Sequence, residues 1–134
     1  MQIWLVSDTH FSHQREFLYK PRGFNTITEM NESIVENWNS KIKPEDLIFH
    51  LGDLCLYDNK DAIKYIKQLN GTIKWIRGNH DSTNRVLEIQ DACSNIHLVG
   101  EMNTSWASVQ KINGYNIYLS HSLLLYKDKM LFKE

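Results

Sequence analysis

The stretch IWLVSDTH, residues 3–10, passes directly from an apolar run into polar residues. Four consecutive apolar residues of β-branched, aromatic and aliphatic type are typical of a buried strand, so we expect a strand over residues 3–6. Asp8 and His10 follow two positions apart, and residues two apart in an extended segment face the same way. We therefore expect a carboxylate and an imidazole that can reach one metal ion together.

The same arrangement of an apolar run followed by polar residues recurs three more times. The runs are 47–51, followed by Gly52-Asp53; 73–76, followed by Arg77-Gly78-Asn79-His80-Asp81; and 115–119, followed by Ser120-His121-Ser122. The carboxyl ends of strands in an α/β sheet point at one crevice, so we expect the polar residues after all four runs to converge there. The candidate metal ligands are Asp8, His10, Asp53, Asn79 and His121.

These candidate ligands mix carboxylate oxygens, imidazole nitrogens and an amide oxygen. Such a mixture suits Mn, Fe, Zn or Ni better than Ca or Mg, which prefer all-oxygen sites. Two metal ions about 3.5–4 Å apart clamp the attacking and leaving oxygens of a phosphoryl displacement and lower the pKa of a shared water. The expected cofactors are two divalent metal ions, which Asp53 can bridge.

Helical patterns alternate with the expected strands. Thr26 and Glu29 have the spacing of a capping box, and the apolar residues 27, 30, 34 and 38 then share one helical face. A second helix is expected over residues 58–69, closed by Asn70-Gly71, and a third over residues 82–93. The chain should therefore begin as a βαβαβ unit with helices packed on the sheet.

The end of the sequence predicts antiparallel strands. Strands are expected over residues 96–99, 105–112 and 115–119. The last two are joined by Asn113-Gly114, a strong two-residue hairpin signal. The expected fold class is α/β, with C-terminal antiparallel strands after the βαβαβ start.

The composition is that of an ordinary globular protein. Residues 1–134 correspond to a single domain by the usual length prior. With 15 basic and 16 acidic residues the net charge is −1, which predicts no broad attraction to nucleic acid or to an anionic membrane, although a local patch stays open. The sequence does not indicate the oligomeric state.

The cysteines and the N-terminus bear on location. Cys55 and Cys93 are too few for a disulfide framework and lack the spacing of a zinc site, so we expect reduced, buried thiols. The N-terminus enters a strand within two residues, so neither a signal peptide nor a membrane span is expected. These observations favour a cytoplasmic protein.

The blocks Asp8-Thr9-His10, Gly52-Asp53, Gly78-Asn79-His80-Asp81 and Ser120-His121, in this order, resemble the calcineurin-like metallophosphoesterase family. The chain is similar to the small single-domain phosphoesterases of bacteria and phages, which open with the Ser-Asp-Thr-His-Phe found here at residues 7–11. The resemblance implies an incomplete version of the family's four-layer α/β/β/α sandwich. It also implies that Asp8 and His10 bind the first metal, that Asp53 bridges, and that Asn79 and His121 bind the second.

The resemblance implies a reaction as well. It implies hydrolysis of small phosphomonoesters or phosphodiesters by a hydroxide held between the metals, with His80 stabilising charge or protonating the leaving oxygen. The residues expected to contact the substrate are Asn79, His80, His13 and Arg15. For Lys20 and Arg22, in the same loop as Arg15, a solvated basic surface is the favoured interpretation.

One part of the family pattern is missing. The family has a Gly-His-x-His segment downstream of the residue matching His121, whereas here Gly114 is the last glycine and His121 the last histidine. Only Asp128 and Glu134 in the tail could serve as ligands, and neither matches the motif. Each ion would then lose one ligand. Three explanations stay open: a fragment of a longer protein, which we favour because the upstream ligand set is complete, a gap filled by water or a partner chain, or a decayed site.

The same residues have structural interpretations. Asp-x-His and Gly-Asp also occur in ordinary turns, and His121 can be a hydrogen-bonded histidine at a strand end. His50 lies inside an apolar run and is interpreted as a packed histidine, and the tryptophans as core residues. The alternative function is therefore a non-catalytic or one-metal scaffold that binds a partner or a phosphate ligand. A nuclease is a third hypothesis.

Overall fold

The computed structural model describes residues 1–99 and 107–122. Its main sheet has four parallel strands in the order β1-β2-β3-β4. They are β1 (Ile3–Val6), β2 (Leu47–His50), β3 (Thr72–Trp75) and β4 (Ile96–Leu98). Each apolar run predicted in this part of the chain forms a strand, and its ends differ from the prediction by one residue at most.

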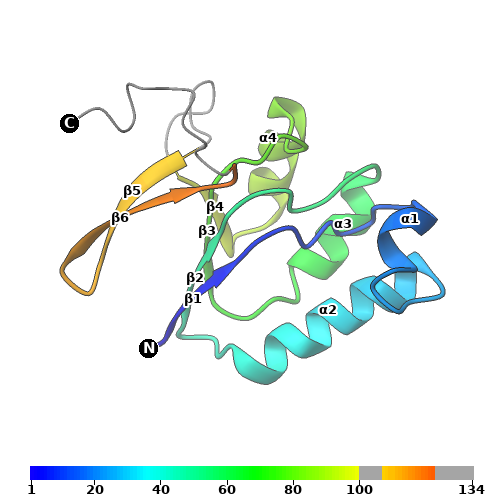
Figure 1. Cartoon of the computed structure of the whole chain (residues 1–134), viewed down its shortest axis with the longest axis horizontal. Helices are drawn as coiled ribbons and strands as arrows, with labels where there is room; N and C mark the ends of the chain where they lie inside the picture. Colours follow the sequence, from blue (N-terminus) through cyan, green and yellow to red (C-terminus); the bar gives the residue numbers. More distant parts are fainter. Residues whose placement is uncertain (100–106, 123–134) are drawn as a thin grey trace.

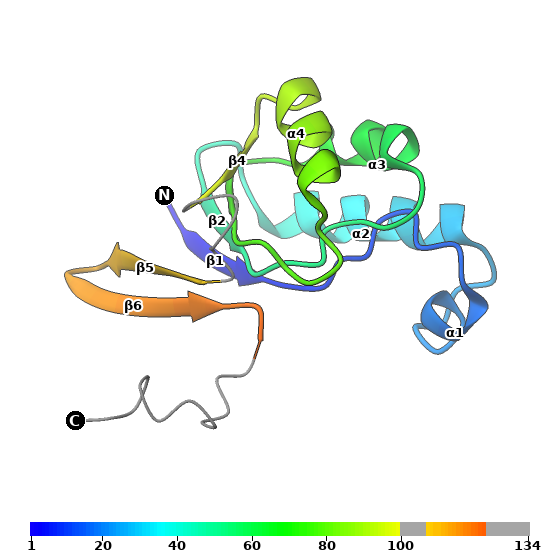
Figure 2. The ribbon, with the colours of Figure 1, turned by 90° about the horizontal axis from the view of Figure 1, so that it is seen from above.

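The helices are α1 (Glu16–Tyr19), α2 (Ile27–Lys41), α3 (Asn59–Ile66) and α4 (Thr83–Ala92). Figure 1 and Figure 2 show α2, α3 and α4 on one face of the sheet. Because the strands follow one another in sequence order and parallel crossovers are right-handed, each crossover returns on the same side. The predicted βαβαβ start is confirmed.

Side-chain caps fix where the three longer helices begin. The caps are Thr26, Asp58 and Ser82, each of which accepts a hydrogen bond from the backbone N–H three residues ahead. The predicted C-terminal end of α3 is wrong, because the helix stops at Ile66 rather than Leu69. There the N–H groups of Gln68 and Leu69 bond to carbonyls only three residues back, a tighter turn that brings Leu69 into the core.

A β-hairpin lies on the face of the sheet opposite the helices (Figure 2). It consists of β5 (Ala107–Ile112) and β6 (Tyr115–Ser120), which pair antiparallel. Asn113 and Gly114 both have positive φ, 50° and 83°, as a type I′ turn requires. The predicted hairpin is confirmed, while residues 105 and 106 of the predicted strand lie outside the described residues.

Two apolar clusters hold these layers together. The larger one fills the space between sheet and helices and includes Trp38 and Trp75, as predicted for core tryptophans. The smaller one joins sheet and hairpin through Phe49, Ile76, Ile112 and Leu119. Trp106 lies outside the described residues.

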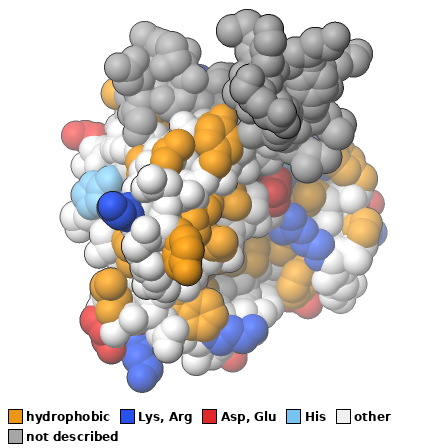
Figure 3. Space-filling view, turned by 60° about the vertical axis from the view of Figure 1, so that its left-hand side comes forward, with side chains coloured by type: hydrophobic (Ala, Val, Ile, Leu, Met, Phe, Trp, Pro, Cys, Tyr) orange, Lys and Arg blue, Asp and Glu red, His pale blue; other side chains and the backbone are white. Residues whose placement is uncertain are grey.

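The described residues thus form helices, a four-stranded sheet and a second, two-stranded layer, in line with an incomplete α/β/β/α sandwich. Figure 3 shows the side that carries the hairpin, where hydrophobic side chains remain at the surface. The exposed large hydrophobic residues of the hairpin are Val109, Tyr115 and Tyr118. In the described part of the chain, no helix combines the length and apolar character needed to span a membrane.

Candidate metal centre

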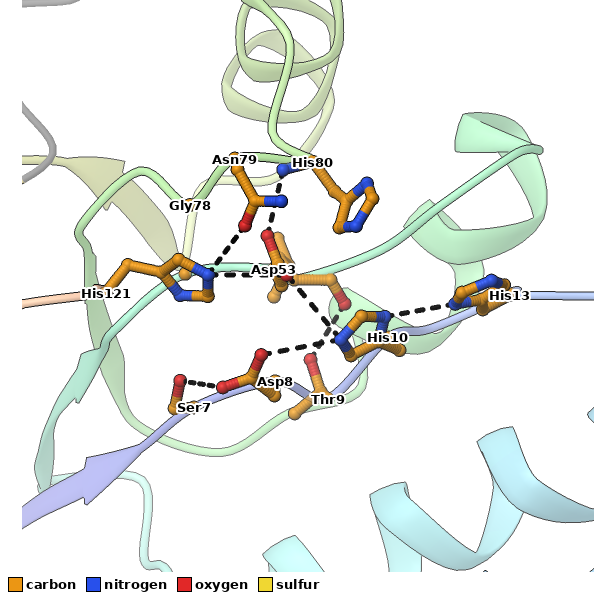
Figure 4. A network of polar contacts seen from close by, with 12 residues as sticks. Ser7, Asp8, Thr9, His10, His13, Asp53, Gly78, Asn79, His80 and His121 are labelled. Carbon is orange, nitrogen blue, oxygen red and sulfur yellow. Dashed lines mark hydrogen bonds and ion pairs between the residues drawn. The ribbon is translucent and has the colours of Figure 1, made fainter. Parts of the chain in front are cut away.

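The candidate ligands meet at one end of the main sheet. Asp8 and His10 follow β1, Asp53 follows β2, Asn79 follows β3, and His121 follows β6. Figure 4 shows their side chains pointing toward one another. One donor atom from each of Asp8, Asp53 and His121 lies within 4.8 Å of the others. The structure therefore brings together all five residues that the sequence proposed as ligands.

Asp53 lies in the middle of this group. Its Oδ2 atom is 3.7 Å from Nε2 of His10 and 3.4 Å from Nε2 of His121. On the other side, Nε2 of His10 is 3.5 Å from Oδ1 of Asp8. A carboxylate between two imidazoles can share a cation with either ring.

The hydrogen bonds of His121 indicate how its ring is protonated. Nδ1 lies 2.9 Å from the carbonyl oxygen of Leu51, and a carbonyl only accepts, so Nδ1 carries the proton. In the neutral ring, Nε2 then directs its lone pair at Oδ1 of Asn79, 2.8 Å away, and at Asp53. Acceptor atoms that face one another in this way are stabilised by a cation, so the residues present fit a divalent metal ion.

His10 is also suited to be a ligand. Burial lowers the pKa of His10, and the nearby Asp53 carboxylate only partly offsets this effect, which favours a neutral ring with a free lone pair. Its Nδ1 atom is 3.1 Å from Nδ1 of His13. The contact with His13 orients the ring so that Nε2 faces the two carboxylates.

His80 stands beside the centre with an exposed ring. Its backbone N–H donates to Oδ1 of Asp53 at 2.9 Å, and the guanidinium of Arg85 donates to its carbonyl oxygen. The ring centroid lies 6.0 Å from that of His10. The backbone of His80 is thus fixed, while its exposed imidazole can reach a group bound at the centre.

Asp81 is a supporting residue that we did not predict from the sequence. It is buried, and its two carboxylate oxygens accept hydrogen bonds from the backbone N–H groups of Asp53, Leu54 and Gly78 and from the indole of Trp75. Burial raises the pKa of Asp81, whereas these hydrogen bonds lower it. The Gly-Asn-His-Asp block contains Asp81, but only the folded chain shows that it fixes the loop of Asp53 to the loop of Asn79.

A second chain of hydrogen bonds joins the loop of Asp8 to that of Asp53. The N–H of Gly52 donates to Nδ1 of His50 at 3.1 Å, so Nε2 of His50 carries the proton and donates to the Thr9 hydroxyl at 3.0 Å. That hydroxyl donates to the carbonyl of Leu54 at 2.8 Å. His50 is fully buried, which confirms its interpretation as a packed histidine.

The loops approach so closely that their backbones are constrained. Asp8, His10 and Asp53 all have positive φ, between 53° and 56°, a region that costs non-glycine residues about 1–3 kcal/mol each. A Cβ atom on Gly78 would lie 2.4 Å from the backbone nitrogen of Asp53. Strained residues clustered at one place are typical of functional sites.

The basic loop after the first ligands differs in part from the prediction. Arg22 was expected to be solvated, but its guanidinium donates to the carbonyl oxygens of Asp8 at 2.9 Å and of Thr9 at 3.0 Å. It therefore stabilises the strained turn that carries the first two candidate ligands, Asp8 and His10. Lys20 is exposed and pairs with Glu16 at 3.3 Å, as a solvated residue should.

Comparison with known proteins identifies the class. The family model of the calcineurin-like phosphoesterases matches residues 1–132. The chain belongs to this family. Over 82 residues it is 44% identical to the uncharacterized protein MJ1445 of Methanocaldococcus jannaschii and 29% identical to the gene 66 protein of Mycobacterium phage L5.

These relatives are longer than the chain. The matches cover 60% and 58% of this chain but 47% and 39% of the two proteins, so the matched segment is less than half of either relative. The fold is similar to that of the protein of unknown function AQ665 from Aquifex aeolicus, with a TM-score of 0.67 and 24% identity, over 91% of this chain and 61% of that one.

Proposed function

We propose that the protein hydrolyses phosphomonoesters or phosphodiesters with two divalent metal ions. The observation that carries the proposal is the position of the Asp53 carboxylate between His10 and His121, at the end of a sheet in a chain of the phosphoesterase family. Asp8 and His10 would hold one ion, Asn79 and His121 the other, and Asp53 both. When bound, the ions supply a lowered pKa for a shared water and neutralise phosphate charge.

The residues of the chain have separate tasks in this proposal. His80 has an exposed ring next to the centre, so it can donate a proton to the leaving oxygen or a hydrogen bond to the phosphate. Asn79 is exposed at the same place and can contact the phosphate as well as the metal. Asp81 and the Thr9–His50 pair hold the ligand loops in position.

Paired substitutions test these tasks. Asp53→Asn is expected to remove bound metal and nearly all turnover, because the amide cannot bridge two ions. His80→Ala is expected to keep the metal and lower kcat by about 10²- to 10⁴-fold, the usual contribution of a general acid. The measurements are metal content by mass spectrometry and hydrolysis of a chromogenic phosphodiester with Mn, Ni and Zn.

His97→Ala is the matched control, because His97 is an exposed histidine of β4 outside the ligand cluster. It should change neither quantity. Equal loss of metal from the Asp53 and His80 variants would refute the separate roles. Metal binding by the wild-type protein without any turnover would instead favour the scaffold.

We further propose a small phosphoester as the substrate and the cytoplasm as the location. Cys55 and Cys93 are free and buried, and burial raises the pKa of the Cys55 thiol to about 12. Unreactive free thiols are compatible with a reducing compartment. The net charge of −1 gives no support to a nucleic-acid substrate.

A further inference from the structure

A cluster of aromatic rings lies next to the candidate metal centre. The ring of His13 is buried and stacks on that of His10, with centroids 5.2 Å apart and an interplanar angle of 25°. Phe17 of α1 meets the His13 ring edge-on at 5.6 Å, and Tyr57, from the loop between β2 and α3, meets it at 5.4 Å. The imidazole of His13 therefore connects a metal ligand to two further rings.

These two rings are left at the surface. Phe17 is 73% exposed and Tyr57 47% exposed, whereas Phe11 and Phe49 are buried in the core. Packing against the interior does not explain where Phe17 and Tyr57 lie.

The backbone of Tyr57 is also strained. Its φ of 63° lies in the left-handed region, which a bulky residue adopts only when its surroundings enforce it. Nε of Arg15 donates to the Tyr57 hydroxyl at 2.7 Å, and the guanidinium carbon lies 5.5 Å from the ring centroid. Arg15 thus fixes the Tyr57 side chain, whose ring meets that of His13.

We propose that Phe17 and Tyr57 form a subsite for the nucleobase of a nucleotide whose phosphate occupies the metal centre. This inference rests on the proposed function and names its substrate class. Aromatic side chains can stack on any nucleobase, and a neighbouring guanidinium strengthens such contacts. One imidazole, that of His13, separates the rings from the ligand His10, so the base and the phosphate of one nucleotide can be held together.

The inference also changes the role expected for two residues. His13 and Arg15 were expected to contact the substrate phosphate. In the proposed subsite, His13 supports the two rings from behind, and Arg15 positions Tyr57. The base of the substrate is contacted by Phe17 and Tyr57, and its phosphate by the metal centre, Asn79 and His80.

The test compares two ligands that differ only in the base. Binding of adenosine 5′-monophosphate and of ribose 5-phosphate is measured by isothermal titration calorimetry in the presence of Mn²⁺. The wild-type protein is expected to bind the nucleotide about ten-fold more tightly, the gain that base stacking typically provides. Phe17→Ala and Tyr57→Ala should bring this ratio close to one, whereas Phe17→Tyr should retain it.

Tyr115→Ala is the matched control, because Tyr115 is a 74% exposed aromatic residue of the hairpin. It should leave the ratio unchanged, and thermal unfolding checks that every variant is folded. Equal affinity of the wild-type protein for the two ligands would overturn the subsite, as would a ratio that survives the Phe17→Ala, Tyr57→Ala double variant. An inactive protein that still prefers the nucleotide would contradict the proposed hydrolysis but not the subsite.

Discussion

At the scale of single residues, the buried imidazole of His50 shows how the site depends on groups that touch no ligand. Both of its nitrogens have partners, the N–H of Gly52 and the hydroxyl of Thr9. Burial lowers the pKa of His50 to about 3, because the charged ring would lose its hydration and one of its two hydrogen bonds. Only the neutral ring can accept from Gly52.

This arrangement predicts how stability changes with pH. Since the folded pKa lies below the ordinary value of about 6.5, the unfolded chain takes up a proton that the folded protein does not, between pH 6.5 and about 3. The contribution of His50 to stability is present above pH 6.5 and is lost as the pH falls through this range, by up to about 1.4 kcal/mol for each pH unit. Urea unfolding at several pH values measures it.

His50→Gln provides the comparison. The variant should lose stability less steeply toward acid pH, because it takes up as much as one proton fewer on unfolding. This difference in slope is expected even if the variant is less stable at pH 7. His10 and His13 also have lowered pKa values, but they are present in both proteins and cancel in the difference. Parallel pH curves for the two proteins would contradict the assignment.

The sequence identified those site residues whose side chains are themselves typical metal ligands. Asp8, Asp53 and His121 were predicted because carboxylates and imidazoles after strands suggest ligands wherever the strands meet. Asp81 was not predicted to support the loop of Asp53, and Thr9 was not paired with His50, since these two contacts join residues 28 and 41 positions apart in sequence. Such partners are set by the packing of loops, which no local pattern encodes.

At the scale of elements, the sequence predicted a helix or strand best where the residues that determine it lie within the element itself. α2 begins after the Thr26 cap and presents the expected apolar face, because both features lie within one helical segment. α1 was not predicted, since a helix of four residues is too short to show periodicity. The predicted end of α3 was wrong because burial of Leu69 in the core, rather than the Asn70-Gly71 signal, determines how the chain leaves the helix.

The contact between the loops after β2 and β3 leads to a prediction of its own. A methyl group on Gly78 would collide with the backbone nitrogen and the carboxylate of Asp53, at 2.4 and 2.5 Å. Because that carboxylate must move, Gly78→Ala is expected to weaken Mn²⁺ binding by about 10- to 100-fold, as for other changes next to metal ligands. Titration calorimetry gives the affinity directly.

Gly114→Ala is the control that separates the effect of crowding at Asp53 from that of a general loss of stability. Gly114 has a φ of 83°, in the left-handed region, but a Cβ there meets nothing within 4 Å. The variant should lose some stability through backbone strain and keep its metal affinity. A similar loss of affinity in both variants would argue against the loop contact as the cause.

At the scale of the whole molecule, the parallel order of four strands determines most of the architecture. It places the three longer helices on one face and leaves the other face for the hairpin. The sequence predicted this class of fold because strands and helices alternate regularly. The packing of the hairpin against the sheet could not be predicted locally, since His121 and Leu51 are 70 residues apart.

Removal of metal should affect the stability of the entire domain. If the ions bind only the folded form, excess chelator should lower the melting temperature, because a ligand at about 100 times its Kd contributes about 3 kcal/mol. Differential scanning calorimetry with and without chelator measures the shift. Asp53→Asn protein is the control, and a chelator effect of the same size in that variant would show that the ions act elsewhere.

The position of His121 at the end of β6 has a consequence for how the two sheets assemble. Leu119 and His121 are two residues apart and therefore face the same side, one into the small apolar cluster and the other toward Asp53. A register slip of one residue in the hairpin would turn both away together. If the protein binds metal at this centre as proposed, a mispaired hairpin would therefore lower its affinity for metal ions.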